Sequence, residues 1–401
     1  MSKGIAITGM GIISAIGNNV AENHAALVAG RKGISRISMI DTIHKDTIMV
    51  GEINFTNQEL EDQLILPSNN SYSRTALLGA LAAKQAVDHA NITNINAWKT
   101  GLISATSVGG MDMTEKYYYD YLESDTHRRY IQSHHIGDSS QKIAKQIGIE
   151  QSMVTTISTA CSSAANAIML GARLIKSGKL DRVIVGGTDC LSKFTINGFK
   201  TLMILSDTYN TPFDENRKGL NLGEAAAFLV LESDKAIQAE NKKVLAYIKG
   251  YGNANDAYHQ TASSDHGDGA TLAMKKALQI AGLNAKEIDY INAHGTATAN
   301  NDLSEGRALL RVFGETTVPD FSSTKAYTGH TLAAAGSIEA VYSILALQNN
   351  IIYPNLNFKT PMKEIDLIPQ TKLKEKKLNT IVSNSLGFGG NCSTLIFSKK
   401  A

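Results

Sequence analysis

The feature of this chain that most constrains its fold is an alternation between short segments rich in β-branched residues and longer segments rich in alanine. The longer segments Ser73–His89 and Ser162–Ile175 carry apolar residues at helical spacing and contain no proline, which predicts helices. The short segments predict buried strands at Ile5–Thr8, Thr100–Ser104, Arg182–Val185, Ala226–Leu231 and Ile288–Ile291. Strands that alternate with helices along a chain are typical of an α/β protein.

The two parts of the sequence resemble each other weakly. Residues 155–179 are predicted to form a strand, a tight turn and a helix of small residues, and residues 321–349 repeat this plan. Segments 222–224 and 389–391 each lead into a strand. On this pattern alone, the alternative is that the two parts are similar by chance. Because the chain has only six prolines and no proline-rich linker, we expect one compact unit of two similar halves, residues 1–240 and 241–401.

Composition and charge argue against several classes of protein. Hydrophobic residues fill 43% of the 401 positions, too many for a disordered chain. The 39 basic and 37 acidic residues leave a net charge of +2, which gives no reason to expect nucleic-acid binding. The sequence has no apolar run of the roughly 18 residues that a membrane span needs, and it does not begin like a signal peptide. Three cysteines are too few for a disulfide framework and favour a reducing, cytoplasmic location.

Two patterns that could indicate a cofactor or a metal fail on spacing. Gly9-Met10-Gly11 follows the first strand, but the next glycine, Gly17, is too far away for a dinucleotide-binding G-x-G-x-x-G. We therefore expect an ordinary glycine turn there and no cofactor. His134-His135 and the histidines of residues 259–268 lack the spacing of a structural zinc site, so we expect no metal.

Cys161 is the strongest candidate for a catalytic residue. It lies where a predicted strand turns into a helix of small residues. Unpaired N–H groups and the positive end of a helix dipole stabilise a thiolate at such a place, so we expect a thiol pKa lowered toward neutrality and a nucleophile. A buried structural cysteine is the alternative. Cys190 and Cys392 lie in or beside apolar strands and are expected to be structural.

Two histidines strengthen the case for catalysis. His294 follows a predicted strand, and His330 opens a helix five residues after Lys325. Each is followed or preceded by a glycine, which allows backbone to approach a ligand closely. One loop histidine alone is more often structural or solvent-facing, but two beside a reactive-looking cysteine favour a nucleophile site. Residues 384–390 form a glycine-rich turn that can direct N–H groups at an oxyanion, although in isolation it reads as a hairpin turn.

Together these segments resemble the β-ketoacyl-acyl carrier protein synthases, the elongating condensing enzymes of the thiolase superfamily. Three segments carry the resemblance, in this order: Thr-Ala-Cys-Ser-Ser around Cys161, Asn-Ala-His-Gly-Thr around His294, and Lys325 followed by Gly329-His330. The resemblance spans essentially the whole chain. It implies a thiolase-like fold of two similar halves in five layers, α-β-α-β-α. It also implies a homodimer that needs no cofactor or metal and whose partner is acyl carrier protein, acyl- or malonyl-loaded.

The resemblance assigns catalytic roles by position. Cys161 would hold the acyl chain as a thioester. His294 and His330 would stabilise the enolate formed when malonyl carrier loses carbon dioxide, and Lys325 would orient them. The backbone N–H groups of Cys161 and Phe388 would form the oxyanion hole.

Further residues receive supporting roles from the same resemblance. Asp302 and Glu305 would support the catalytic residues without acting on the substrate themselves. Thr296 and Thr298 would contact pantetheine, Phe388 would act as a gate, and Val108 would limit acyl-chain depth.

The implied reaction is 3-oxoacyl-[acyl-carrier-protein] synthesis in fatty acid biosynthesis, by decarboxylative Claisen condensation. Two alternatives stay open: a ketosynthase of a specialised polyketide or aryl-polyene pathway with a dedicated carrier, and a catalytically silent chain-length subunit of a heterodimer. The sequence departs from the family pattern at Thr211, where arginine is usual, and at Lys218, where aspartate is common. It departs again at Asn391-Cys392, where the family has Thr-Asn.

Overall fold

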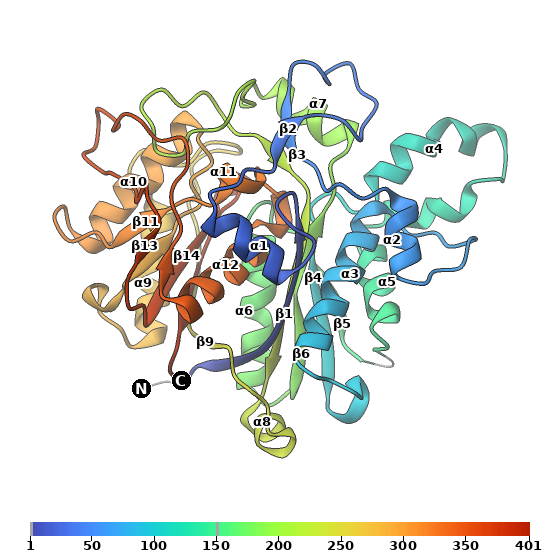
Figure 1. Cartoon of the computed structure of the whole chain (residues 1–401), viewed down its shortest axis with the longest axis horizontal. Coiled ribbons are helices and arrows are strands. Elements are labelled where there is room, and N and C mark those ends of the chain that lie inside the picture. Colours follow the sequence, from blue (N-terminus) through green and yellow to red (C-terminus); the bar gives the residue numbers. More distant parts are fainter. Residues whose placement is uncertain (1–2, 150–151) are drawn as a thin grey trace.

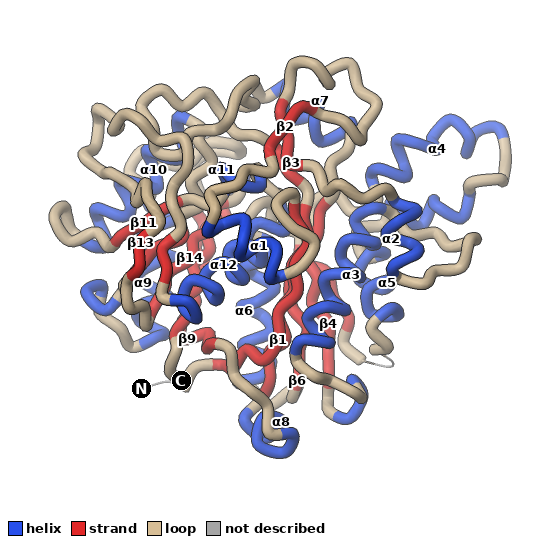
Figure 2. The backbone as a smooth tube through the Cα atoms, in the orientation of Figure 1, coloured by secondary structure: helices blue, strands red, loops and turns tan. Residues whose placement is uncertain are grey.

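The computed structural model describes residues 3–149 and 152–401 and is built around one mixed β-sheet (Figures 1 and 2). Ten strands lie in the order β11-β10-β14-β15-β9-β1-β8-β6-β4-β5. The first five along the chain are β1 (Ile5–Ser14), β4 (Thr100–Ala105), β5 (Val154–Ile157), β6 (Arg182–Asp189) and β8 (Ala225–Glu232). The other five are β9 (Ala246–Asn255), β10 (Tyr290–Asn292), β11 (Asp320–Ser322), β14 (Thr380–Leu386) and β15 (Asn391–Ser398).

The strand order is the same in both parts of the chain. From the edge inward, the sets run β5-β4-β6-β8-β1 and β11-β10-β14-β15-β9. Counted along the chain, each set has its third strand outermost, then the second, fourth, fifth and first. The two sets join where residues 5–7 of β1 pair antiparallel with residues 246–248 of β9. The expected similar halves are therefore two five-stranded sheets of one topology, which join at β1 and β9 into the single large sheet. The boundary at residue 240 stays a prediction.

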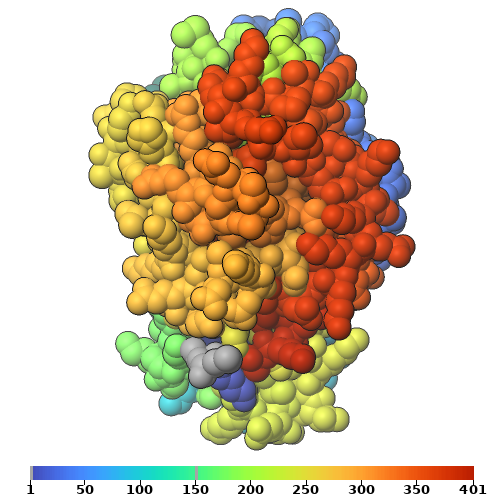
Figure 3. All heavy atoms as spheres, turned by 90° about the vertical axis from the view of Figure 1, so that its left-hand side faces the viewer, coloured from blue at the N-terminus to red at the C-terminus, as the bar shows by residue number. Residues whose placement is uncertain are grey.

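Helices cover both faces of each sheet and give five layers (Figure 1). On one outer face, α3 (Arg74–His89) packs against β1, β8 and β6, beside α5 (Asp138–Gln146). Between the sheets, α6 (Ser163–Lys176) and α12 (Ala335–Asn349) contact each other. On the other outer face, α9 (Asp268–Ala281) packs against β9 and β15, beside α10 (Ala299–Phe313). The space-filling view of that side is covered mainly by the second half of the chain (Figure 3).

The burial of α12 explains its place in the central layer. Every residue from Ala335 to Leu347 is buried, and apart from Glu339 these residues are apolar or small and lie on all sides of the helix. A helix without a polar face is stable only where protein covers it on all sides. By contrast, α3 has exposed positions such as Lys84 and Asp88 on its solvent face.

Shorter elements complete the fold. The remaining strands form two small sheets: β2 (Ile34–Arg36), β3 (Met49–Gly51) and β7 (Leu222–Gly223) in one, and β12 (Ile351–Ile352) and β13 (Lys374–Glu375) in the other. The remaining α-helices are α1 (Val20–Val28), α2 (Asn57–Gln63), α4 (Met111–Glu123), α7 (Lys193–Thr201), α8 (Asp234–Glu240) and α11 (Lys325–Thr328). Short 3₁₀ turns lie at residues 95–97, 128–134, 285–287, 332–334 and 388–390. In the described part of the chain, no helix combines the length and the apolar character that crossing a membrane requires.

The glycine turn expected at residues 9–11 is wrong, because β1 continues through it to Ser14. A Cβ on Gly9 would lie 2.3 Å from the carbonyl oxygen of Ala86, and one on Gly11 would lie 2.1 Å from that of Ala82. Both carbonyls belong to α3. The glycines therefore let helix and strand approach closely, which a single sequence cannot distinguish from a turn.

The predicted helices are placed within one residue. The side chain of Ser73 accepts a hydrogen bond from the backbone N–H of Ala76 and caps α3, whose first residue is Arg74. The predicted glycine-rich turn at residues 384–390 is shorter than expected, because residues 384–386 pair with β15 as part of β14.

Candidate active site

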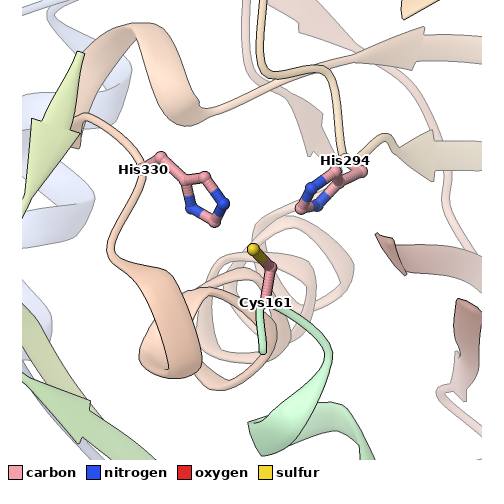
Figure 4. A group of neighbouring side chains, drawn as sticks. All are labelled: Cys161, His294 and His330. Atoms are coloured by element: carbon pink, nitrogen blue, oxygen red, sulfur yellow. The ribbon is translucent and has the colours of Figure 1, made fainter. Parts of the chain in front are cut away.

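Three predicted catalytic side chains meet at one point (Figure 4). One ligand-type atom from each of Cys161, His294 and His330 lies within 4.8 Å of the other two. The two imidazole rings are edge to face, with centroids 5.3 Å apart. Cys161 follows β5, His294 follows β10 and His330 follows α11. Both halves of the chain therefore contribute to one site, and all three side chains are buried.

The turn that carries Cys161 is locally strained. Ala160, just before it, has a φ of 53°, which is unfavourable for a residue with a Cβ. The helix α6 begins only at Ser163, two residues beyond the thiol. The chain therefore turns sharply between β5 and α6 and presents the sulfur to the cavity rather than to the helix core.

Burial raises the pKa of the Cys161 thiol to about 11, opposite to the lowering expected from the sequence. The thiol pKa is lowered by the charge of Lys325 and by the N–H groups of Phe388 and of Cys161 itself. The cost of removing a thiolate from water is larger than these three effects, so the net change in the pKa is a rise. The Cys161 side chain is therefore a neutral thiol at pH 7 and would have to lose its proton in order to attack a carbonyl carbon.

Lys325 fixes the tautomer of His294. The Lys325 Nζ lies 3.3 Å from the His294 Nδ1. An ammonium group only donates, so Nδ1 accepts and the ring hydrogen sits on Nε2. Burial, together with the nearby Lys325 charge, lowers the pKa of His294 well below its ordinary value. His294 is therefore neutral and can donate from Nε2.

His330 is also neutral. Burial and the charge of Lys325 lower its pKa well below the ordinary value. Its buried Nδ1 has no hydrogen-bond partner among the described residues. A buried imidazole nitrogen without a partner is costly.

Glu339 pairs with Lys325 and was missed by the sequence analysis. The Lys325 Nζ donates to the Glu339 Oε1, and both side chains are at most 3% exposed. Burial raises the pKa of Glu339 to about 7, against the opposing effect of Lys325. The pair anchors Lys325 to α12 and so holds the His294 tautomer. A glutamate inside a helical segment carries no sequence signal for such a role.

Asp302 and Glu305 support the histidine loop through its backbone. The Glu305 carboxylate accepts N–H groups from His294 at 2.9 Å and Gly295 at 2.8 Å. The Asp302 carboxylate accepts N–H groups from Phe213 at 2.7 Å and Ala297 at 3.1 Å. Both acids lie on α10. They hold the path of the loop rather than a histidine side chain.

Phe388 lies in the turn between β14 and β15. Its N–H group is directed at the Cys161 sulfur closely enough to lower the thiol pKa. Its ring stacks on Phe199 of α7, with centroids 5.9 Å apart. The Phe199 contact, which the sequence analysis missed, fixes the ring at the cavity wall.

A cavity of about 410 Å³ leads to Cys161, and its lining includes Thr296, Thr298 and Phe388. The hydroxyls of Thr296 and Thr298 lie 3.0 Å apart. Cys392, expected to be structural, also lines this cavity.

Val108 is not among the residues that line this cavity. It packs in the apolar cluster that contains Leu191 and Ile196, so its role in limiting chain depth stays a prediction.

By ligand type, Cys161, His294 and His330 could hold a metal ion, and the structure gives no other such group among the described residues. The ammonium of Lys325 lies within 3.3 Å of the His294 ring and would repel a cation. This argues for the predicted metal-free site.

Both parts of the chain match models of one family. The β-ketoacyl synthase N-terminal domain matches residues 2–236, and the β-ketoacyl synthase C-terminal domain matches residues 245–359. The 3-oxoacyl-[acyl-carrier-protein] synthase 2 of Staphylococcus aureus (strain N315) is 34% identical over 411 residues, covering 99% of each chain. The protein of the same name from Coxiella burnetii (strain RSA 493 / Nine Mile phase I) is 33% identical over 413 residues, covering 98% of each. The chain belongs to the β-ketoacyl synthase family.

Solved ketosynthases share the fold over its full length. The ishigamide ketosynthase/chain length factor gives a TM-score of 0.92 at 29% identity and full coverage of both chains. The ketosynthase ApeO, in complex with its chain length factor ApeC from Xenorhabdus doucetiae, gives 0.85 at 32% identity, covering 99% of this chain and 98% of that one. The expected thiolase-like fold and the expected family are confirmed. The chain is a condensing acyltransferase of this family.

Proposed function

We propose that Cys161 carries the acyl chain during the condensation. Its sulfur attacks the thioester carbonyl of an acyl carrier, and the thiol proton passes through a neighbouring imidazole to the departing carrier thiol. The N–H groups of Cys161 and Phe388 stabilise the tetrahedral oxyanion. Removing one donor of this kind typically costs about 3 kcal/mol of transition-state stabilisation.

The two histidines then act on the malonyl thioester. Loss of carbon dioxide leaves an electron pair on the α-carbon and negative charge on the thioester oxygen. The Nε2–H of His294, whose tautomer Lys325 fixes, and the ring of His330 donate to that oxygen. The enolate carbon attacks the acyl-Cys161 carbonyl, expels the thiolate and releases a 3-oxoacyl carrier.

The single observation that carries this proposal is the convergence of the Cys161, His294 and His330 atoms within 4.8 Å. A nucleophile and two neutral donors at one cavity end match an acyl transfer followed by enolate formation. The test is intact-protein mass spectrometry after incubation with acyl carriers of several chain lengths, then with malonyl carrier. We expect an acyl adduct on Cys161 that malonyl carrier discharges with release of carbon dioxide. No adduct with any chain would contradict the proposal.

Acyl carrier protein is the proposed partner. Arg217 and exposed Lys218 lie at the rim of the cavity, and no aspartate or glutamate lines it among the described residues. An opening that is positive and free of acids favours the anionic, phosphate-bearing arm of a carrier. A structural neighbour is described as a type II polyketide synthase acyl-carrier protein in complex with its ketosynthase.

A homodimer and a cytoplasmic location complete the proposal. β5 is an edge strand of the large sheet and is only half-buried, and α4, in the same half of the chain, exposes Tyr118 and Tyr119. An unpaired sheet edge and exposed aromatic side chains favour pairing with a second copy. All three cysteines are free thiols, which supports a reducing compartment. Light scattering of the purified chain would test the dimer.

A specialised polyketide or aryl-polyene ketosynthase is the second candidate, and the neighbours described as ketosynthases with chain length factors favour it. The chain length that acylates Cys161 fastest would separate the two functions. A silent chain-length subunit is disfavoured, because Cys161, His294, His330 and Lys325 are all present and assembled.

A further inference from the structure

One residue connects the two turns that carry the proposed oxyanion donors. Asn391 is the first residue of β15, directly after the turn that contains Phe388. Its backbone oxygen accepts the N–H of Gly387 at 2.9 Å, and its side-chain Oδ1 accepts the hydroxyl of Ser162 at 2.8 Å. Gly387 precedes Phe388, and Ser162 follows Cys161. Asn391 therefore binds a direct neighbour of each donor.

The Asn391 Oδ1 is the centre of a dense set of donors. Besides Ser162, whose single hydroxyl hydrogen is shared with the Thr159 carbonyl at 2.8 Å, it accepts Asn166 Nδ2 and Asn253 Nδ2, each at 2.9 Å. Asn166 lies on α6 and Asn253 on β9. Three donors on one oxygen leave the side chain little freedom to rotate. The Asn391 side chain therefore holds α6, β9 and the Phe388 turn together.

The two turns also touch directly. A Cβ on Gly387 would lie 2.9 Å from the Thr159 carbonyl oxygen and 3.3 Å from the Cys161 nitrogen. The backbones of the two turns therefore approach closely, with only the Ser162 hydroxyl beside the contact at 3.2 Å. A small shift of one turn against the other changes the angle between the Cys161 and Phe388 N–H groups, and misplacement by about 1 Å can reduce rates about a hundredfold.

We propose that Asn391 is a positioning residue that sets the geometry of the oxyanion hole by fixing the Cys161 turn against the Phe388 turn. The inference rests on the proposed function, because it presumes that these two N–H groups receive the oxyanion. It goes beyond that function by assigning a role to a position where this sequence departs from its family. Asn391 touches neither substrate nor sulfur and acts only through its neighbours.

Two reactions of the same thiol separate this role from a general structural one. Acylation by the octanoyl thioester of N-acetylcysteamine passes through an oxyanion. Alkylation by iodoacetamide displaces iodide at a saturated carbon and forms none. Both need the Cys161 thiolate, so the ratio of the two rate constants at one pH cancels any change in the fraction of the thiol that is ionised. The ratio therefore reports the oxyanion hole.

The substitution Asn391→Ala should lower the ratio of acylation to alkylation by about tenfold to a hundredfold. Asn391→Asp should restore it, because the Oδ1 atom of Asn391 accepts all three hydrogen bonds and a carboxylate oxygen can accept them too. Ser162→Ala breaks the same link from the other side and should repeat the loss if the alanine variant at position 391 does not fold. Ser393→Ala is the matched control: its hydroxyl bonds Asn166 in the same network and reaches neither turn.

The outcomes are distinct. An unchanged ratio in a folded Asn391→Ala, or an equal fall in Ser393→Ala, would overturn the positioning role while the proposed function stands. Failure of the unsubstituted protein to acylate, despite normal alkylation, would overturn the proposed function and this inference with it. A lowered ratio restored by aspartate supports both.

Discussion

The two halves of the molecule share one scaffold and contribute different chemistry. In the first half, the edge strand β5 leads through a strained turn with Cys161 into α6. In the second half, the edge strand β11 leads through Lys325 and His330 into α12. Because α6 and α12 pack against each other between the sheets, the two turns face one another. The repeated topology decides where the site lies, and the side chains of each turn decide what it does.

The comparison extends to how each half packs its outer helix. Gly9 and Gly11 of β1 leave room for α3, and Gly250 and Gly252 of β9 leave room for α9. A Cβ on Gly252 would meet the carbonyl oxygen of Ala273 at 2.0 Å, nearly the same approach as that of Gly11 to Ala82. The loops after β4 and β10 differ instead. The first carries Thr106 and Ser107, and the second carries His294.

The strongest test of the comparison removes the contribution of the first half. Cys161→Ala should abolish formation of the acyl-enzyme, a loss of at least about a thousandfold, because the alanine offers no nucleophile. The fold should persist, since only one sulfur atom is lost from a small buried side chain. Intact mass and circular dichroism measure both. Acylation that survives in this variant would place the nucleophile elsewhere.

The next test removes a contribution of the second half. His294→Ala should reduce malonyl decarboxylation by about a hundredfold to a thousandfold, because the enolate oxygen loses a donor. Self-acylation of Cys161 should fall much less. His89→Ala, on the exposed face of α3, serves as the matched control. Equal losses of decarboxylation and acylation would mean that the division of labour between the halves is not as proposed.

The shared scaffold can be tested by paired glycine substitutions. Gly11→Ala and Gly252→Ala should each destabilise the protein by about 1–3 kcal/mol, because the added methyl group collides with a helix carbonyl. Urea unfolding measures the free energy. Gly198→Ala, where a Cβ meets nothing within 4 Å, should change stability little. Strongly unequal changes in the free energy of unfolding at the two strand positions would contradict the structural equivalence of the halves.

The smallest effect concerns the pH dependence of Cys161. Its thiol pKa is raised to about 11, so the reactive thiolate is the minor form at neutral pH. Alkylation by iodoacetamide should therefore rise about tenfold per pH unit and keep rising above pH 9. A plateau near pH 7 would instead support the lowered pKa expected for a cysteine at a helix N-terminus.

Local pattern identified the motif residues, the long helices α3 and α6 and several strands of the large sheet. Helical spacing without an internal proline placed α3 within one residue, and short β-branched runs placed the inner strands. The motifs around Cys161, His294 and Lys325-Gly329-His330 singled out the site through their order along the chain. Such features depend on neighbours in sequence, which is why they can be read without the fold.

Contacts between distant residues decided the rest. The sequence by itself determined the α/β class, the repeated plan and the set of reactive side chains. Only the tertiary structure turned the Gly9–Gly11 segment into strand, paired Glu339 with Lys325 and raised the Cys161 pKa. Each of these depends on burial and on partners far along the chain or on other elements. Desolvation and close packing arise only once the halves have assembled, and no local pattern encodes them.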